Sequence, residues 1–143
     1  MPLLNDRDRE AVRTELAKMR GPVKLVVFSQ ALSSTADLCQ QNEALVREVA
    51  ELSDQITVEV LNLAIDRDRA EAYGVADVPA IVVEGARDYG IRFLGIPSGY
   101  EFSNLIDSMI VASSGETSLS DATKTSLQAL ETDIDIKVFS TPT

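Results

Sequence analysis

The fold of this chain is decided by the stretch Tyr73-Gly74-Val75-Ala76-Asp77-Val78-Pro79-Ala80-Ile81-Val82-Val83-Glu84. Its last five residues are mostly apolar and β-branched, which is typical of a buried strand. Gly74 ends a short helix over residues 66–73 that Asp66 caps. Pro79 has no backbone N–H to donate, so it stands directly before the strand and not inside it. The stretch therefore predicts a helix, a turn and a strand.

Before this stretch, the apolar pattern predicts two helices that alternate with two strands. Apolar residues at positions 38, 45, 49 and 52 define the buried stripe of the second helix, which Ser33 or Ser34 caps. A strand, a helix and a strand of this length form a right-handed parallel crossover. The expected elements are a helix from Asn5 or Asp6 to about residue 20, a strand over 23–28, a helix over 34–52 and a strand over 56–63.

After this stretch, residues 85–88 make a turn to a second short strand over 89–94, which predicts an antiparallel hairpin. Ser98 and Glu101 have capping-box spacing and open a helix that continues through Ile110. The fold class is therefore α/β, with a βαβ unit, a β-hairpin, flanking helices and a mixed central sheet.

Residues 111–119 have the composition of a linker, and Ser120 caps a further helix that contains Leu127 and Leu130. A short strand over 134–140 follows. When Phe139 is placed over Phe28, Leu127 falls over Leu16, so the opening helix and strand occur twice. We expect a complete unit over residues 1–115, and the linker, helix and first strand of a truncated second unit over residues 116–143. The alternative is a C-terminal helix and edge strand that complete a single domain.

The composition excludes several classes of function. The formal net charge of −10 repels phosphate backbones, so we expect no nucleic-acid partner. With no histidine and one cysteine, the chain lacks the usual ligands for zinc and most transition metals. There is no apolar run of membrane-spanning length and no basic-then-apolar start. We therefore expect a cytoplasmic protein without a metal, a cofactor or a membrane partner.

The order of the elements, with a proline just before the third strand, resembles the thioredoxin fold. Residues 73–79 resemble the segment of that family that ends in a cis proline beside the active site. This resemblance implies a cis Val78-Pro79 bond and a docking edge, at which the backbone of Val78 and Pro79 binds an extended protein substrate.

Residues 89–102 carry a more specific resemblance. They resemble a segment shared by the protein disulfide oxidoreductases of hyperthermophiles and the N-terminal region of the alkyl hydroperoxide reductase flavoprotein subunit, with Tyr100 where histidine is usual. Both relatives are tandem thioredoxin-fold proteins. The resemblance does not separate the two families.

A redox site in this fold needs Cys-x-x-Cys between the first strand and the next helix. Here that loop offers Ser33, Ser34, Thr35 and Asp37, so the active-site-equivalent loop contains no cysteine pair. Cys39 is a weak catalytic candidate, since a free cysteine on a helix is more often a small buried hydrophobe than a reactive thiol.

These residues favour a redox-silent half of a thiol-disulfide oxidoreductase. The resemblance implies scaffolding and docking for a Cys-x-x-Cys after Thr143, with electrons passed on to protein disulfides. Its partners would be a protein substrate and the second thioredoxin unit, and a homodimer through the strand over 134–140 stays open. Two alternatives remain: a free-standing peptide-binding module, and a monothiol enzyme that uses Cys39.

Overall fold

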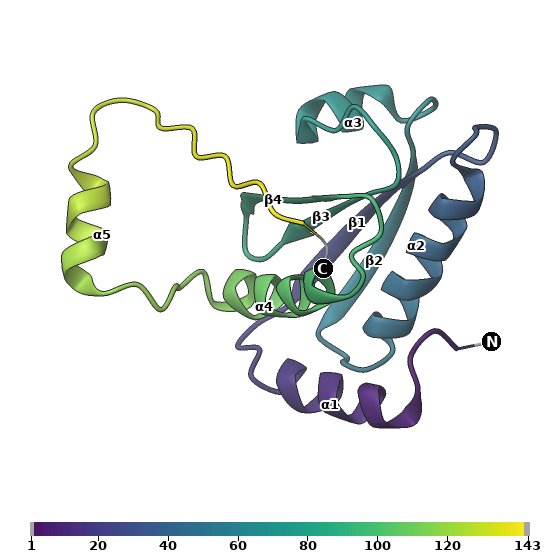
Figure 1. Ribbon diagram of the computed structural model, residues 1–143, viewed down its shortest axis with the longest axis horizontal. Coiled ribbons are helices and arrows are strands. Elements are labelled where there is room, and N and C mark those ends of the chain that lie inside the picture. Colours follow the sequence, from purple (N-terminus) through teal and green to yellow (C-terminus); the bar gives the residue numbers. More distant parts are fainter. Residues whose placement is uncertain (1, 142–143) are drawn as a thin grey trace.

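The computed structural model describes residues 2–141 and contains one four-stranded mixed sheet with helices on both faces (Figure 1). The strand order is β2-β1-β3-β4, where β1 pairs in parallel with β2 and antiparallel with β3, and β3 pairs antiparallel with β4. The α/β class, the βαβ unit and the hairpin are thus confirmed. The elements are α1 (Asp6–Leu16), β1 (Val23–Ser29), α2 (Ala36–Ala50), β2 (Ile56–Asn62), α3 (Arg67–Tyr73), β3 (Ala80–Glu84), β4 (Asp88–Leu94), α4 (Tyr100–Ser114) and α5 (Asp121–Gln128).

Two apolar clusters lie on opposite faces of the sheet. Alternate residues of β1 divide between them: Leu25 and Val27 pack with α1, α2 and α4, whereas Val26 and Phe28 pack with α3. Because side chains alternate along a strand, one short apolar run supplies both cores. The seven-residue α3 is the only helix that contributes to the second cluster among the described residues.

The structure corrects several of the helix caps that the sequence predicts. Asn5 caps α1 as expected, since its side chain accepts a hydrogen bond from the Asp8 backbone N–H. Neither Ser33 nor Ser34 caps α2, which starts after Thr35 and has no side-chain cap. Ser98 does not cap α4 either, since Gly99 takes that position with a φ of 60°, a left-handed backbone that favours glycine. Asp66 does not cap α3 with its side chain. That side chain accepts a hydrogen bond from the backbone N–H of Asn62, the last residue of β2.

The buried stripe of α2 also differs from the expected one. Leu38 is 46% exposed, and the inner face carries Cys39, Asn42, Val46 and Val49. The stripe is therefore displaced by one residue at its start. It still places Leu45 and Val49 in the core, as the sequence predicts.

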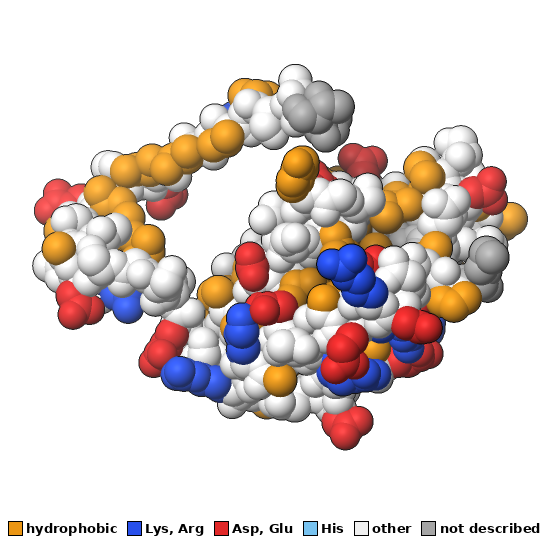
Figure 2. Space-filling model, turned by 60° about the horizontal axis from the view of Figure 1, so that its bottom comes forward, with side chains coloured by type: hydrophobic (Ala, Val, Ile, Leu, Met, Phe, Trp, Pro, Cys, Tyr) orange, Lys and Arg blue, Asp and Glu red, His pale blue; other side chains and the backbone are white. Residues whose placement is uncertain are grey.

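The C-terminal region leaves the body of the unit (Figure 1). Helix α5 forms with Ser120 as its cap, but none of its residues is buried. The strand expected over 134–140 is absent from the described part of the chain, because those residues have no paired strand. Apolar side chains lie along this arm in Figure 2, and the exposed large ones are Leu119, Leu127, Leu130, Ile134, Ile136, Val138 and Phe139.

None of the helices within residues 2–141 is long and apolar enough to span a lipid bilayer.

Candidate functional site

The loop between β1 and α2 occupies the position where the sequence analysis expects the active site. Ser33 Oγ donates to the Gln30 carbonyl at 3.2 Å and accepts from the Thr35 N–H at 3.3 Å, and it lies 3.0 Å from Thr35 Oγ1. Ser34 and Asp37 are both exposed. With no histidine in the chain, no imidazole activates these hydroxyls as nucleophiles. The hydrogen bonds of Ser33 therefore shape the loop.

Cys39 lies four residues beyond Thr35 on the inner face of α2. It is 1% exposed, and its backbone N–H donates to the Thr35 carbonyl at 2.9 Å. The expected burial of Cys39 on the apolar side of its helix is confirmed. A thiol in this position has no open path to a disulfide of another protein.

Asn42 is a buried polar residue that the sequence analysis does not identify. It is 0% exposed, and neither its Nδ2 nor its Oδ1 has a hydrogen-bond partner among the described residues. Leaving an amide buried without partners costs free energy. The available signal was its spacing of three residues from Cys39 and four from Val46, which places it on their side of the helix.

Val78 and Pro79 lie directly before β3. The peptide bond between them is cis, as the sequence predicts. Phe28 pairs with Ala80, so this segment and the loop after β1 lie at the same end of the sheet. The Pro79 carbonyl accepts from the Gly95 N–H at 2.8 Å, while the backbone N–H and carbonyl of Val78 have no partner within residues 2–141.

A pocket of about 430 Å³ opens beside the segment that leads to Val78. It joins the ends of β1 and β2 to α3 and to the residues before Val78, and it combines apolar side chains with one cation, one carboxylate and one amide. Its lining residues are Gln30, Leu63, Ala64, Arg67, Ala70, Glu71, Val75 and Ala76. Gln30 is the residue of the loop after β1 that lines this pocket, and none of the residues predicted for the site, Ser33, Ser34, Thr35, Asp37, Val78 and Pro79, lines it.

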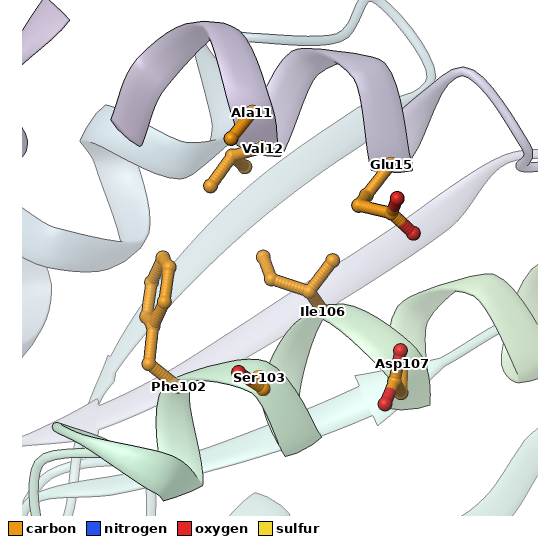
Figure 3. A pocket seen from close by; sticks show the side chains of 7 residues that line it. All are labelled: Ala11, Val12, Glu15, Phe102, Ser103, Ile106 and Asp107. Atoms are coloured by element: carbon orange, nitrogen blue, oxygen red, sulfur yellow. The ribbon is translucent and has the colours of Figure 1, made fainter. Parts of the chain in front are cut away.

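A second pocket lies between α1 and α4 (Figure 3). Val12, Phe102 and Ile106 form its apolar wall, and the carboxylates of Glu15 and Asp107 lie toward one end. It shares no lining residue with the pocket beside the segment that leads to Val78.

Charged residues brace the face of the sheet beside α3. Arg69 donates to both carboxylate oxygens of Glu59 at 3.1 Å, and Lys24 Nζ lies 2.5 Å from the same carboxylate. These hydrogen bonds, from Arg69 first and Lys24 second, lower the pKa of Glu59 to about 2.

Arg92 holds the hairpin against α3. Its guanidinium binds Asp88 through two hydrogen bonds, at 2.8 and 2.6 Å, and its Nε donates to the Tyr73 carbonyl at 2.9 Å. These contacts give Arg92 a structural role. Within residues 2–141, no three His, Cys, Asp or Glu side chains lie close enough together to hold a metal ion.

A four-stranded sheet in this order, with a proline before the third strand at the end of the sheet where the loop after β1 lies, defines a thioredoxin-fold protein. No protein-family model matches the chain. It is 35% identical over 86 residues to a probable thioredoxin of Methanothermobacter thermautotrophicus, a match that covers 59% of this chain and 93% of that protein. A probable thioredoxin of Methanothermobacter marburgensis is 35% identical over 89 residues, or 62% of this chain and 96% of that one. The chain belongs to the thioredoxin-like family.

Two solved structures resemble the chain over most of its length. The alkylhydroperoxide reductase AhpF of Enterococcus faecalis superimposes with a TM-score of 0.79 at 25% identity, over 89% of this chain and 61% of that one. A protein disulfide oxidoreductase from Aeropyrum pernix superimposes with a TM-score of 0.74 at 28% identity, over 88% of this chain and 55% of that one. The chain thus spans about three fifths of the length of these structures or less.

Proposed function

We propose that this chain is the redox-silent, substrate-docking unit of a thioredoxin-like thiol-disulfide oxidoreductase. The observation that carries the proposal is the active-site-equivalent loop, where Ser33, Ser34 and Thr35 stand in place of a cysteine pair and the single thiol, Cys39, is buried. Exchange needs one thiolate to attack and a second thiol to resolve the mixed disulfide. One buried thiol performs neither step.

The docking part of the proposal rests on Val78. Its unpartnered backbone N–H and carbonyl are the groups with which an extended chain pairs by β-augmentation. The pocket beside this segment offers space for one side chain of that substrate. Docking at this site uses hydrogen bonds and burial, so it does not need a reactive cysteine.

The catalytic part would belong to a second unit, with a Cys-x-x-Cys after Thr143. Support comes from α5 and residues 134–140, which repeat the pattern of α1 and β1 but bury none of their residues on the first unit. Their apolar side chains would gain a core in a second sheet. The partners are then a protein disulfide substrate and that second unit, in the reducing cytoplasm, where a lone thiol stays free.

A free-standing peptide-binding module would use the same docking site without a second unit. The codons that follow Thr143 in the gene distinguish these two functions, because a Cys-x-x-Cys motif is expected only in the first. A monothiol enzyme that uses Cys39 is opposed by the 1% exposure of that residue.

Reduction of insulin by dithiothreitol tests the proposal directly. The chain of 143 residues should not raise the rate above the uncatalysed one, whereas a longer chain with the following cysteine pair should raise it. Mutating that pair should abolish the activity, and Cys39→Ser should leave it intact. Turnover by the chain that ends at Thr143, if it disappears in Cys39→Ser, would refute the proposal.

A further inference from the structure

Four segments of the chain meet at the end of the sheet that contains Val78. Ser29 at the end of β1 pairs with Asn62 at the end of β2, and Ala80 at the start of β3 pairs with both Phe28 and Leu94. The loop after β1, the loop after β2, the segment before β3 and the end of β4 therefore lie at the same end of the sheet.

Three large apolar side chains stand exposed on these segments. Leu32 after β1 is 95% exposed, Ile65 after β2 is 80% exposed, and Leu94 at the end of β4 is 67% exposed. We call this set the apolar rim. Large apolar groups exposed at one end of a sheet are typical of a surface that a partner covers. The unpartnered backbone of Val78 lies at the same end of the sheet.

The acidic side chains at this surface favour a partner with positive charge. Glu71 lines the pocket and Asp77 directly precedes Val78, and neither forms an ion pair within the described residues. Arg67 is the one cation in the pocket lining. The chain as a whole has a net charge of −10, which attracts cationic segments and repels acidic ones.

We propose that this surface binds an extended protein segment in which apolar residues alternate with Lys or Arg. The segment pairs with the Val78 backbone, places apolar side chains on the rim and in the pocket, and directs cations toward Glu71 and Asp77. Alternation suits the site because neighbouring side chains of an extended chain point to opposite sides. This inference rests on the docking function proposed above and adds the chemistry of the docked segment.

Three fluorescein-labelled peptides of equal length test it by fluorescence anisotropy. The first alternates Leu with Lys, the second replaces each Lys with Glu, and the third replaces each Leu with Ser. The Leu-Lys peptide should bind at least about tenfold more tightly than either of the others at low salt, and its affinity should fall as the ionic strength rises.

Variants with matched controls locate the binding. The double variant Leu32→Ser, Ile65→Ser should bind the Leu-Lys peptide about tenfold more weakly. The control variant Leu119→Ser, Ile136→Ser removes exposed apolar groups from the C-terminal arm and should bind it as the original chain does. Glu71→Gln with Asp77→Asn should weaken binding and reduce its salt dependence. Asp6→Asn with Glu131→Gln removes the same charge elsewhere and should have little effect.

The outcomes separate the two proposals. If the Leu-Glu and Leu-Lys peptides bind equally and the rim variant weakens both, docking stands and the preference for a basic segment is refuted. If none of the three peptides binds, docking itself fails. If the control variants weaken binding as much as the site variants do, the attraction is general and the site is refuted.

Discussion

Cys39 and Asn42 lie three residues apart on α2, and both are completely or almost completely buried. Apolar periodicity correctly places Cys39 inside, but it also assigns Leu38 to the core, where the structure has a side chain that is 46% exposed. Neighbouring positions on a helix differ by about 100°, so a small error in phase exchanges a buried residue for an exposed one.

At Cys39, we expect slow chemistry and a small structural contribution. The native thiol should react with an alkylating probe far more slowly than in urea, because 1% of the residue is exposed. Cys39→Ala should lower the free energy of unfolding by about 1 kcal/mol, since it removes little volume. Mass spectrometry after timed alkylation measures the first effect and urea unfolding the second. Complete labelling of the folded protein within seconds would contradict the burial.

At Asn42, we expect a substitution that stabilises. Asn42→Leu removes two buried polar atoms without partners and keeps a similar shape, so the free energy of unfolding should rise by about 1–3 kcal/mol. Urea unfolding measures it, with the exposed Gln40→Leu as the control that changes little. A loss of stability in Asn42→Leu would mean that the amide makes a buried hydrogen bond.

Among the elements, β2 and α3 are joined by the ion network around Glu59. The depressed pKa of Glu59, from its ordinary value of 4.5 to about 2, means that the folded state favours the carboxylate. This contribution to stability is complete above about pH 4.5 and is lost as the pH falls toward 2.

Urea unfolding between about pH 2 and 5 should therefore show a decline in stability that Glu59→Gln makes shallower. Glu10→Gln, which removes an exposed pair with Arg13 on α1, should leave the decline in place. Equal slopes in the two variants would show that Glu59 is not responsible.

The helix caps mark where element prediction failed. Ser33, Ser34, Asp66 and Ser98 are all suitable cap residues by type, yet none of their side chains caps the helix it was assigned to. A cap requires the chain to enter the helix in a particular direction, and the preceding strand or turn sets that direction. Asn5 and Ser120 do cap as predicted.

At the scale of the whole molecule, both apolar clusters lie within residues 2–115, and none of residues 116–141 is buried. Removing residues 116–143 should shift the melting temperature by less than about 2 °C, since none of residues 116–141 is buried and the Arg20–Glu116 pair is exposed. Leu16→Ala in α1, at 1% exposure, is the control that should lower it clearly. A large fall in the melting temperature on truncation would instead show that the arm packs on the core of residues 2–115.

Sedimentation of the same truncated chain tests the arm as an assembly element. If residues 134–140 pair with a second copy and form a homodimer, the full chain should be larger than the truncated one by a whole protomer at high concentration. Equal protomer numbers for the two chains would exclude this role of the arm.

The sequence by itself determined the order of the helices and strands from α1 to α5, the parallel crossover, the hairpin and the absence of a cysteine pair. These follow from local apolar periods and residue types, which do not need distant partners. Only the tertiary structure shows that the amide of Asn42 is buried without a partner among the described residues. It alone also shows the pocket beside the segment before Val78 and the exposure of Leu32, Ile65 and Leu94 at one end of the sheet. It also decided that residues 134–140 form no strand, because a strand exists only when another strand pairs with its backbone groups.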